Sequence, residues 1–277
     1  MKKQWKMLLL LLCMFFSGSE QVRAEEGDIV RLPVVMYHHI SRKPESWNNY
    51  VVSVDEFERD MRYLAENGWK SVSMRQLLDW YQGKFEMPEK AFMITFDDGF
   101  ESTKAYAAPI LEAYGFNAVV AVIGSVCEKF SICDEHHAEL SNLSWEDAVE
   151  LAQSGTFEFQ CHTWDMHAYS PRFGCNKLPR ESVATYRRNL STDLSRFLTA
   201  CAGRGLDILP SIAYPYGAYD SDTTDVVRDM GFLAAFTCDE RVNELRGEEE
   251  ELFHLARYNR PHGPGSEKFF SKWEKSD

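Results

Sequence analysis

The chain has 277 residues, enough for one large domain or two small ones, and its hydrophobic content of 44% can supply a full core. Its net charge of −13 argues against nucleic acid as a partner, because nucleic-acid binding needs a basic face. A neutral or cationic substrate suits such a chain better.

The first 24 residues have the features of a signal peptide. Lysines precede an apolar run at residues 7–16, and Val22-Arg23-Ala24 places small residues where a signal peptidase cuts. The apolar run is too short to span a bilayer. We therefore expect a secreted or cell-envelope protein whose mature chain is residues 25–277, with no stable membrane span after cleavage. An uncleaved anchor is the alternative.

Apolar runs and helical patterns alternate along the mature chain. In chain order, they predict a strand at 32–40, a helix from the N-cap Asp55 to Gly68, a strand at 69–73, a helix at 74–81, a strand at 91–96, a helix at 108–114, a strand at 117–123, irregular chain at 127–142, a helix at 144–154, a strand at 157–161, a loop at 169–178, a helix at 181–203, a strand at 210–214, a helix at 221–230, a strand at 232–236, an acidic loop at 239–251, a last strand at 252–258 and a loosely held tail after Pro264.

This alternation is typical of βαβ units and of a parallel sheet, either open or closed into a barrel. No composition shift or linker divides the chain, so a single domain is expected. Six cysteines follow the predicted signal peptide, and export permits disulfides. Cys127 and Cys133 are close enough in sequence to close a small loop, although buried free thiols remain the alternative.

Two adjacent carboxylates follow the predicted strand Ala91–Phe96. Asp97 and Asp98 come directly after it, with Gly99 next. The C-terminal ends of strands are where α/β folds keep their functional sites. Neighbouring side chains of an extended chain point in opposite directions, so the two carboxylates can take different roles. An Asp-Gly turn that also caps a helix is the alternative explanation.

Two further polar clusters follow predicted strands. His162 and His167 come after the strand at 157–161, and Tyr214–Gly217 after the strand at 210–214. In a parallel barrel the strand ends share one face, so these clusters are expected to meet the two carboxylates. A carboxylate with two imidazoles leaves coordination positions open, as in catalytic zinc sites, and a second carboxylate can act as general base. Ordinary loop histidines are the alternative.

The three clusters resemble the motifs of NodB-type polysaccharide deacetylases (carbohydrate esterase family 4). Thr95-Phe96-Asp97-Asp98-Gly99 matches the first motif, His162-Thr163 with His167 looks like the second, and Tyr214-Pro215-Tyr216-Gly217 is similar to the third. The five-residue histidine spacing looks like the branch with poly-β-1,6-N-acetylglucosamine deacetylases. The resemblance covers roughly residues 32–260 and implies an α/β fold, a distorted (β/α) barrel with fewer than eight repeats.

By this resemblance Asp98, His162 and His167 bind a divalent metal, and Asp97 is the base that activates the attacking water. The backbone N–H of Tyr216 helps to hold the oxyanion. Zinc is favoured, and cobalt, nickel or iron(II) also suits this donor set. The implied substrate is an N-acetylated polysaccharide, which is hydrolysed to acetate and a free amine, and a monomer is expected.

Two positions depart from the family's pattern. Ala213 stands where members often have an Arg that orients the base, and Arg257 stands where they often have the His that acts as general acid. We expect His38, near the end of the first strand, to replace that acid, with His39 pointing away. A structural hydrogen bond is the alternative role for His38, and His262 is a second candidate for the acid.

Trp164, Tyr216 and Tyr219 are candidates to stack on sugar rings, with core packing as the alternative for each. The same water chemistry would also serve an O-acetyl esterase acting on a glycan. A carbohydrate-binding protein with a relic metal site belongs to a different class. The intact Asp97, Asp98, His162 and His167 argue against a relic, whereas the two departures favour it.

Overall fold

The computed structural model describes residues 29–133 and 136–274, so the predicted signal peptide lies outside the described residues. The main sheet contains β2 (Val34–Tyr37), β5 (Lys70–Ser71), β6 (Ala91–Phe96), β7 (Ala118–Val122), β8 (Phe157–Cys161), β9 (Ser211–Ala213), β10 (Ala234–Phe236) and β12 (Tyr258–Asn259). The α-helices are α1 (Val54–Glu66), α2 (Met74–Tyr81), α3 (Ala108–Tyr114), α4 (Gly124–Cys133), α5 (Trp145–Gln153), α6 (Val183–Arg204), α7 (Ser221–Asp229) and α8 (Ser266–Phe270).

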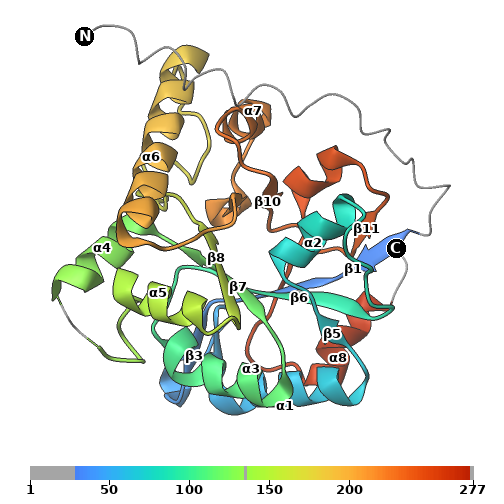
Figure 1. The fold of residues 1–277 in the computed structure, drawn as a ribbon. Helices are drawn as coiled ribbons and strands as arrows, with labels where there is room; N and C mark the ends of the chain where they lie inside the picture. The colour runs from blue at the N-terminus through green and yellow to red at the C-terminus, as the bar shows by residue number, and fades with distance from the viewer. Residues whose placement is uncertain (1–28, 134–135, 275–277) are drawn as a thin grey trace, which may run out of the picture.

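The main sheet is parallel, in the order β10-β9-β8-β7-β6-β2-β12, and β5 pairs with β6. The helices lie around its outside, with α1 beside α3 and α6 beside α7 (Figure 1). Strands β2, β6, β7, β9 and β10 are buried along their whole length, because helices cover one face of the sheet and the barrel interior the other. The predicted distorted (β/α) barrel is confirmed.

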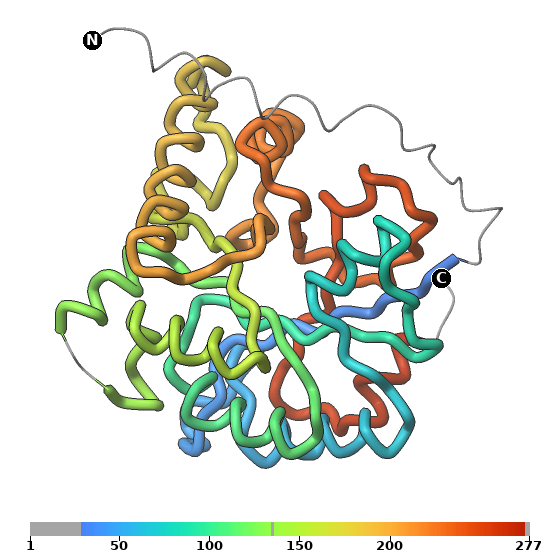
Figure 2. The backbone as a smooth tube through the Cα atoms, in the orientation of Figure 1, coloured from blue at the N-terminus to red at the C-terminus, as the bar shows by residue number. Residues whose placement is uncertain are grey.

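The segment at residues 255–260 closes this curled sheet. At one end Leu255 forms a parallel bridge to Phe236 of β10, and at the other β12 pairs with β2. The backbone N–H of Leu255 donates to Ala235 O (3.0 Å), and that of Arg260 donates to Met36 O (3.0 Å). The smooth trace shows this segment running between the first and last strands of the sheet (Figure 2). Residues between these anchors, Arg257 among them, therefore lie in the barrel wall between β10 and β2.

Short elements complete the chain. They are two small sheets, β1 (Val30–Leu32) with β11 (Asn243–Leu245) and β3 (His39–Ser41) with β4 (Val51–Ser53); the 3₁₀ turns η1 (Pro44–Ser46), η3 (Pro215–Gly217), η4 (Glu249–His254) and η5 (Ser271–Trp273); and the π-helical turn η2 (Thr103–Ala107). In the part of the chain that the structure describes, none of the helices has the length and apolar character needed to cross a membrane.

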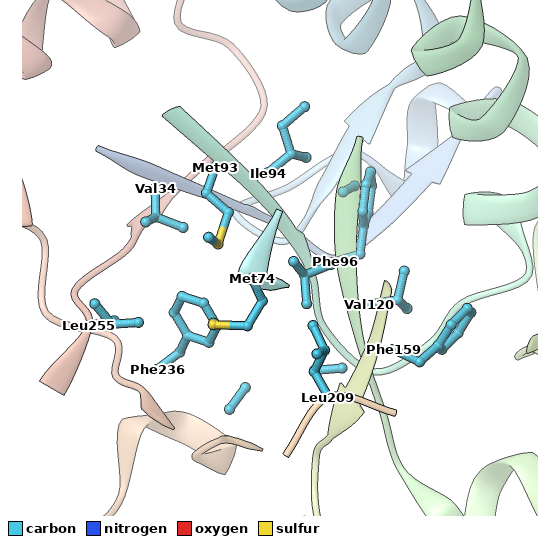
Figure 3. Packing of buried hydrophobic residues seen from close by; sticks show 14 of the residues in the cluster. Val34, Met74, Met93, Ile94, Phe96, Val120, Phe159, Leu209, Phe236 and Leu255 are labelled. Atoms are coloured by element: carbon cyan, nitrogen blue, oxygen red, sulfur yellow. The ribbon is translucent and has the colours of Figure 1, made fainter. Parts of the chain in front are cut away.

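Apolar side chains pack closely on both faces of the main sheet. Figure 3 shows Phe96 of β6 near Val120 and Phe159, and Met93 near Val34. All four of these neighbours and Phe96 itself are at most 1% exposed. A packed interior fixes the strand ends relative to one another, so groups carried on those ends hold a defined geometry.

Several sequence predictions need correction. The first strand is broken at His38, between β2 and β3, and α1 is capped by Ser53 rather than Asp55, because Ser53 and Glu56 form a reciprocal capping box. Residues 124–133 form helix α4, although 127–142 were predicted to be irregular. The last predicted strand, 252–258, begins in the turn η4, and within this range only Tyr258 belongs to a strand, β12. The predicted acidic loop at 239–251 contains β11.

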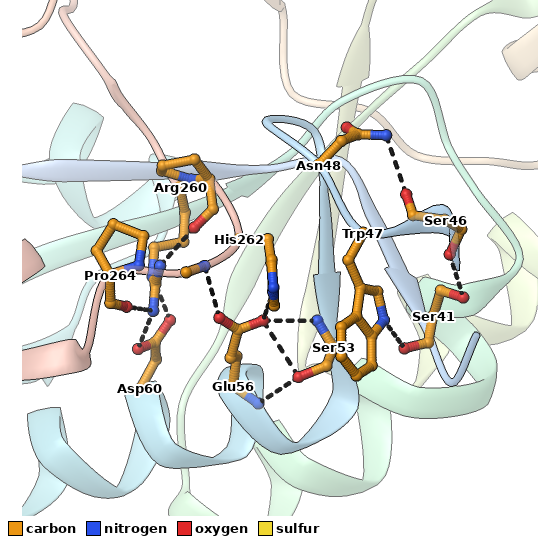
Figure 4. A network of polar contacts seen from close by, with 12 residues as sticks. Ser41, Ser46, Trp47, Asn48, Ser53, Glu56, Asp60, Arg260, His262 and Pro264 are labelled. Atoms are coloured by element: carbon orange, nitrogen blue, oxygen red, sulfur yellow. Dashed lines mark hydrogen bonds and ion pairs between the residues drawn. The ribbon is translucent and has the colours of Figure 1, made fainter. Parts of the chain in front are cut away.

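The tail after Pro264 is firmly packed, contrary to prediction. Phe269, Phe270 and Trp273 are each at most 3% exposed, and the rings of Phe270 and Trp273 lie 4.6 Å apart. Just before the tail, Arg260 donates two hydrogen bonds to Asp60 of α1, at 2.7 and 3.0 Å (Figure 4). These contacts tie the C-terminal segment to α1 and keep the closing segment in place.

Candidate metal centre and catalytic residues

The predicted convergence of three strand ends is present. Asp97 and Asp98 follow β6, His162 follows β8, and Tyr216 follows β9. With His167 these residues line one cavity of about 680 Å³ at the C-terminal end of the barrel. The strand order β6-β7-β8-β9 places these ends side by side, which is why residues far apart in sequence meet there.

Unusual backbone conformations shape this edge of the barrel. Asp98 (φ 67°), Thr163 (φ 68°) and Tyr216 (φ 59°) adopt the left-handed region, which is uncommon for residues other than glycine. Each lies in one of the three turns that follow β6, β8 and β9. Strained residues of this kind persist where the surrounding structure holds them and cluster at functional sites.

Asp98, His162 and His167 form a compact donor set. The Nε2 atoms of His162 and His167 lie 3.5 and 3.2 Å from Asp98 Oδ1, and one ligand atom from each residue lies within 4.8 Å of the others. The Nδ1–H of His162 donates to Ala213 O at 2.8 Å, and Nδ1 of His167 forms a hydrogen bond with the Tyr216 hydroxyl at 3.0 Å. Each ring is thus held with Nε2 toward the carboxylate.

This geometry fits a divalent cation. Ala213 O can only accept, so a neutral His162 carries its proton on Nδ1 and turns a bare Nε2 lone pair toward Asp98. Asp98 Oδ1 is buried and makes no hydrogen bond. Facing lone pairs repel unless a positive charge lies between them. Two imidazoles and one carboxylate with open positions is the donor set of catalytic zinc sites, and it also suits iron, cobalt or nickel.

The pKa values of Asp98 and His162 also indicate that this cluster favours a positive charge beside the carboxylate. Burial raises the pKa of Asp98, but the adjacent imidazoles of His162 and His167 outweigh it and hold that pKa well below its usual range. Burial lowers the pKa of His162, but Asp97 and Asp98 outweigh it and raise that pKa. The centre therefore favours negative charge on the carboxylate and positive charge beside it.

Asp97 is held by Arg257, which the sequence analysis noted as a departure at the position of the family's acid but did not pair with Asp97. Arg257 Nη1 and Nη2 donate to the two carboxylate oxygens of Asp97 at 2.7 and 2.9 Å, and its Nε donates to Thr237 O at 3.0 Å. Arg257 is 0% exposed and Asp97 3%. Burial raises the pKa of Asp97, but the guanidinium of Arg257 and the ring of His162 outweigh it and lower that pKa. Asp97 is therefore a charged and fixed carboxylate.

Arg257 also resolves the two departures noted in the sequence. An orienting Arg is absent at Ala213, and an unexpected Arg stands at 257. The closing segment carries Arg257 to the strand ends, where both Nη groups of its guanidinium donate to the carboxylate of Asp97. The sequence lacks an Arg at position 213 and has an unexpected Arg at position 257. These two departures together could have indicated that Arg257 takes over the orienting role.

His38 lines the cavity beside Asp97 and Asp98, and its Nδ1 is buried with no hydrogen-bond partner in the described chain. Burial lowers the pKa of His38, against the opposing effect of the two carboxylates. His39 also lines this cavity, contrary to the prediction that it points away, but its Nδ1 is engaged in a hydrogen bond with Ser102 Oγ at 2.9 Å. His38 is thus the imidazole on this wall with an unused nitrogen.

Two candidate residues lie elsewhere. Trp164 was predicted to meet sugar, but it is 6% exposed and stacks near Trp145 beneath the guanidinium of Arg196, so the structure places it in the core. His262 was the second candidate for the acid, but its Nδ1 lies 2.6 Å from Glu56 Oε2 in the network that ties the C-terminal segment to α1 (Figure 4). Aromatic residues missed by the sequence analysis line the cavity instead.

The cysteines form no disulfide in the described part of the chain. All six that follow the predicted signal peptide are free thiols, and Cys127 and Cys133 lie on the same helix, α4, without a bond between them. Four of the six are buried, where burial raises the thiol pKa and favours the neutral form, as for Cys175. The fold is therefore held together without cross-links at these positions.

The fold and the site together define a distorted (β/α) barrel that carries, at its C-terminal end, two histidines and a carboxylate placed so that they could hold a metal ion. Residues 84–235 match the model of the polysaccharide deacetylase family, so the chain belongs to that family. The family resemblance predicted from the motifs is confirmed.

The chain is similar to a poly-β-1,6-N-acetyl-D-glucosamine N-deacetylase of Staphylococcus aureus, with 29% identity over 70% of this chain and 63% of that protein. The match thus spans less than two thirds of that relative. In fold it is similar to a de-N-acetylase from Aggregatibacter actinomycetemcomitans (TM-score 0.70, 22% identity, 88% of this chain and 99% of that one). It is also similar to IcaB from Ammonifex degensii (TM-score 0.66, 26% identity, 84% and 91%).

Proposed function

We propose that the protein is an exported, metal-dependent N-deacetylase of a polysaccharide that contains N-acetylglucosamine. The observation that carries this proposal is the convergence of Asp98, His162 and His167 beside a second carboxylate, Asp97, that Arg257 keeps charged. Family membership and the similarity to poly-N-acetylglucosamine deacetylases support the choice of substrate. The lysine-led apolar segment at the N-terminus supports export.

Asp98, His162 and His167 would hold the cation, with Tyr216 and Ala213 fixing the two imidazoles. When bound, the cation would acidify water and polarise the acetyl carbonyl. Asp97 would take a proton from the attacking water, and Arg257 keeps its carboxylate ionised and aimed for that task.

The products require a second proton transfer. Breaking the C–N bond of the acetamide leaves an amine, which needs a proton, and the cleaved acetyl group leaves as acetate. His38 would give that proton in its imidazolium form, which Asp97 and Asp98 favour against the effect of burial, and would then take a proton back from water. The backbone N–H of Tyr216 would stabilise the oxyanion; the left-handed φ of 59° there turns this part of the backbone.

The test pairs metal content with acetate release. Wild type is expected to bind about one metal per chain and to release acetate from N-acetylglucosamine oligomers. Asp98→Ala should lose both. His38→Ala should keep its metal and lose most of the activity. Acetate release from oligomers that carry O-acetyl groups, compared with release from N-acetylated oligomers, distinguishes an esterase from an N-deacetylase. A wild-type chain that binds no metal, or near-full activity in His38→Ala, would contradict the corresponding assignment.

A further inference from the structure

A group of aromatic side chains lines the active-site cavity next to the metal centre. Tyr169 and Phe173 come from the loop between β8 and α6, and both pack on the ring of Tyr216. The ring centroids of Tyr169 and Phe173 lie 4.3 and 5.1 Å from that of Tyr216, at interplanar angles of 29° and 16°. Below them, the Tyr216 hydroxyl meets the candidate ligand His167.

Two of these rings are strongly exposed. Tyr169 is 71% exposed and Phe173 40%. An aromatic ring that only packs the core is removed from water, whereas rings left open beside a functional cavity indicate a binding surface. The flat faces of such rings match the apolar C–H faces of pyranose rings, and a tyrosine hydroxyl adds a polar edge.

The loop that carries these rings is fixed in place. A Cβ atom added to Gly174 would lie 2.5 Å from Pro215 O and 2.9 Å from Ala218 Cβ, so the loop touches the turn of Tyr216 directly. The Arg172 guanidinium donates to both carboxylate oxygens of Glu181, at 2.8 and 2.9 Å. A surface that is already ordered loses little conformational entropy when a ligand binds.

We propose that Tyr169, Phe173 and Tyr216 form an aromatic platform that binds the sugar neighbouring the one that is deacetylated. This inference rests on the proposed function, and it adds which side chains hold the neighbouring sugar, namely the exposed rings of Tyr169 and Phe173 beside Tyr216. The platform adjoins His167 through Tyr216, so a sugar on it lies one position away from the reacting acetamide.

The variant Tyr169→Ala removes the most exposed ring of the platform and keeps the metal ligands. Its KM for a pentamer of β-1,6-linked N-acetylglucosamine should rise about fivefold with kcat little changed, because a stacked ring contributes roughly 1 kcal/mol. The KM for the monosaccharide should stay the same. Tyr169→Phe keeps the ring and should behave as wild type. Leu140→Ala is the matched control, since Leu140 is also 71% exposed and lies outside the cavity lining.

Pentamer affinity, measured by calorimetry on the metal-loaded protein, separates this inference from the proposed function. Loss of affinity in Tyr169→Ala supports the platform even if wild type releases no acetate, an outcome that would refute only the deacetylase proposal. Equal pentamer KM and Kd in wild type and Tyr169→Ala, an equal KM increase for monosaccharide and pentamer, or a wild type that binds no pentamer would each overturn the platform.

Discussion

The change Arg257→Gln tests the pairing that keeps the proposed base charged. The side chain loses its positive charge and its two-pronged contact, while Asp97 stays buried at 3% exposure. Removing one partner of a buried ion pair typically costs about 3–5 kcal/mol, because the remaining charge has no compensation. We expect the free energy of unfolding at neutral pH to fall by about that amount.

Activity should fall as well. A buried carboxylate without its partner takes up a proton more readily, and a protonated Asp97 cannot accept one from water. General-base catalysis typically contributes about 10²–10⁴-fold, so kcat for acetate release should fall by about 100-fold or more. Arg257→Lys keeps the positive charge but loses the bidentate geometry, so its kcat should lie between those of wild type and Arg257→Gln. Metal content should be unchanged, since the ligands are untouched.

A double variant keeps the test informative if Arg257→Gln folds poorly. Asp97→Asn removes the carboxylate that needs a counter-charge, so Asp97→Asn with Arg257→Gln should be more stable to urea than Arg257→Gln alone. Near-wild-type kcat in Arg257→Gln, or an unfolding free energy reduced by less than about 1 kcal/mol, would show that the ion pair does not have the role argued here.

Three further substitutions test other contacts. Tyr216→Phe removes the hydroxyl that orients His167, so metal affinity measured against a competing chelator should fall by about 10-fold or more; unchanged affinity would refute that support. Glu56 has a pKa lowered to about 2, as hydrogen bonds from the backbones of Ser53 and Gly263 and from His262 outweigh burial. The ionised Glu56 therefore stabilises the fold above its unfolded-state pKa of about 4.3, and this stabilisation is lost as the pH falls toward about 2. Glu56→Gln should flatten the pH dependence of the free energy of urea unfolding between these two pH values. An unaltered slope in the variant would contradict this role of Glu56. Trp164→Ala should cost about 3–5 kcal/mol of stability through a core cavity and leave the KM for oligomers unchanged, and a selective rise in KM would restore its predicted contact with sugar.

The parts of the fold that follow from local pattern were predictable from the sequence. The strands at Ala91–Phe96 and Ala118–Val122 are uninterrupted apolar runs, and the cluster of Asp98, His162 and His167 follows from the rule that parallel strand ends share one edge. The capping box of Ser144 and Asp147 was likewise predictable from its spacing.

Features that depend on distant contacts were not predictable. The tail is polar in part, and its order comes from burying Phe270 and Trp273 against other elements rather than from local propensity. Arg257 could not be placed because its partner Asp97 lies 160 residues away. Trp164 was mistaken for a binding residue since periodicity does not distinguish a buried ring from an exposed one, and Tyr169 was missed for the same reason.

The closing segment at residues 255–260 has a consequence for the order in which the protein assembles. Pairing β12 with β2 joins chain positions more than two hundred residues apart, and such distant pairings form late because a long loop must close first. Until then β2 and β10 present open strand edges, which are prone to pair with other chains. A nascent or truncated chain that stops before Leu255 therefore lacks the guanidinium that keeps Asp97 charged, and catalytic competence and protection from aggregation should arrive in the same folding step.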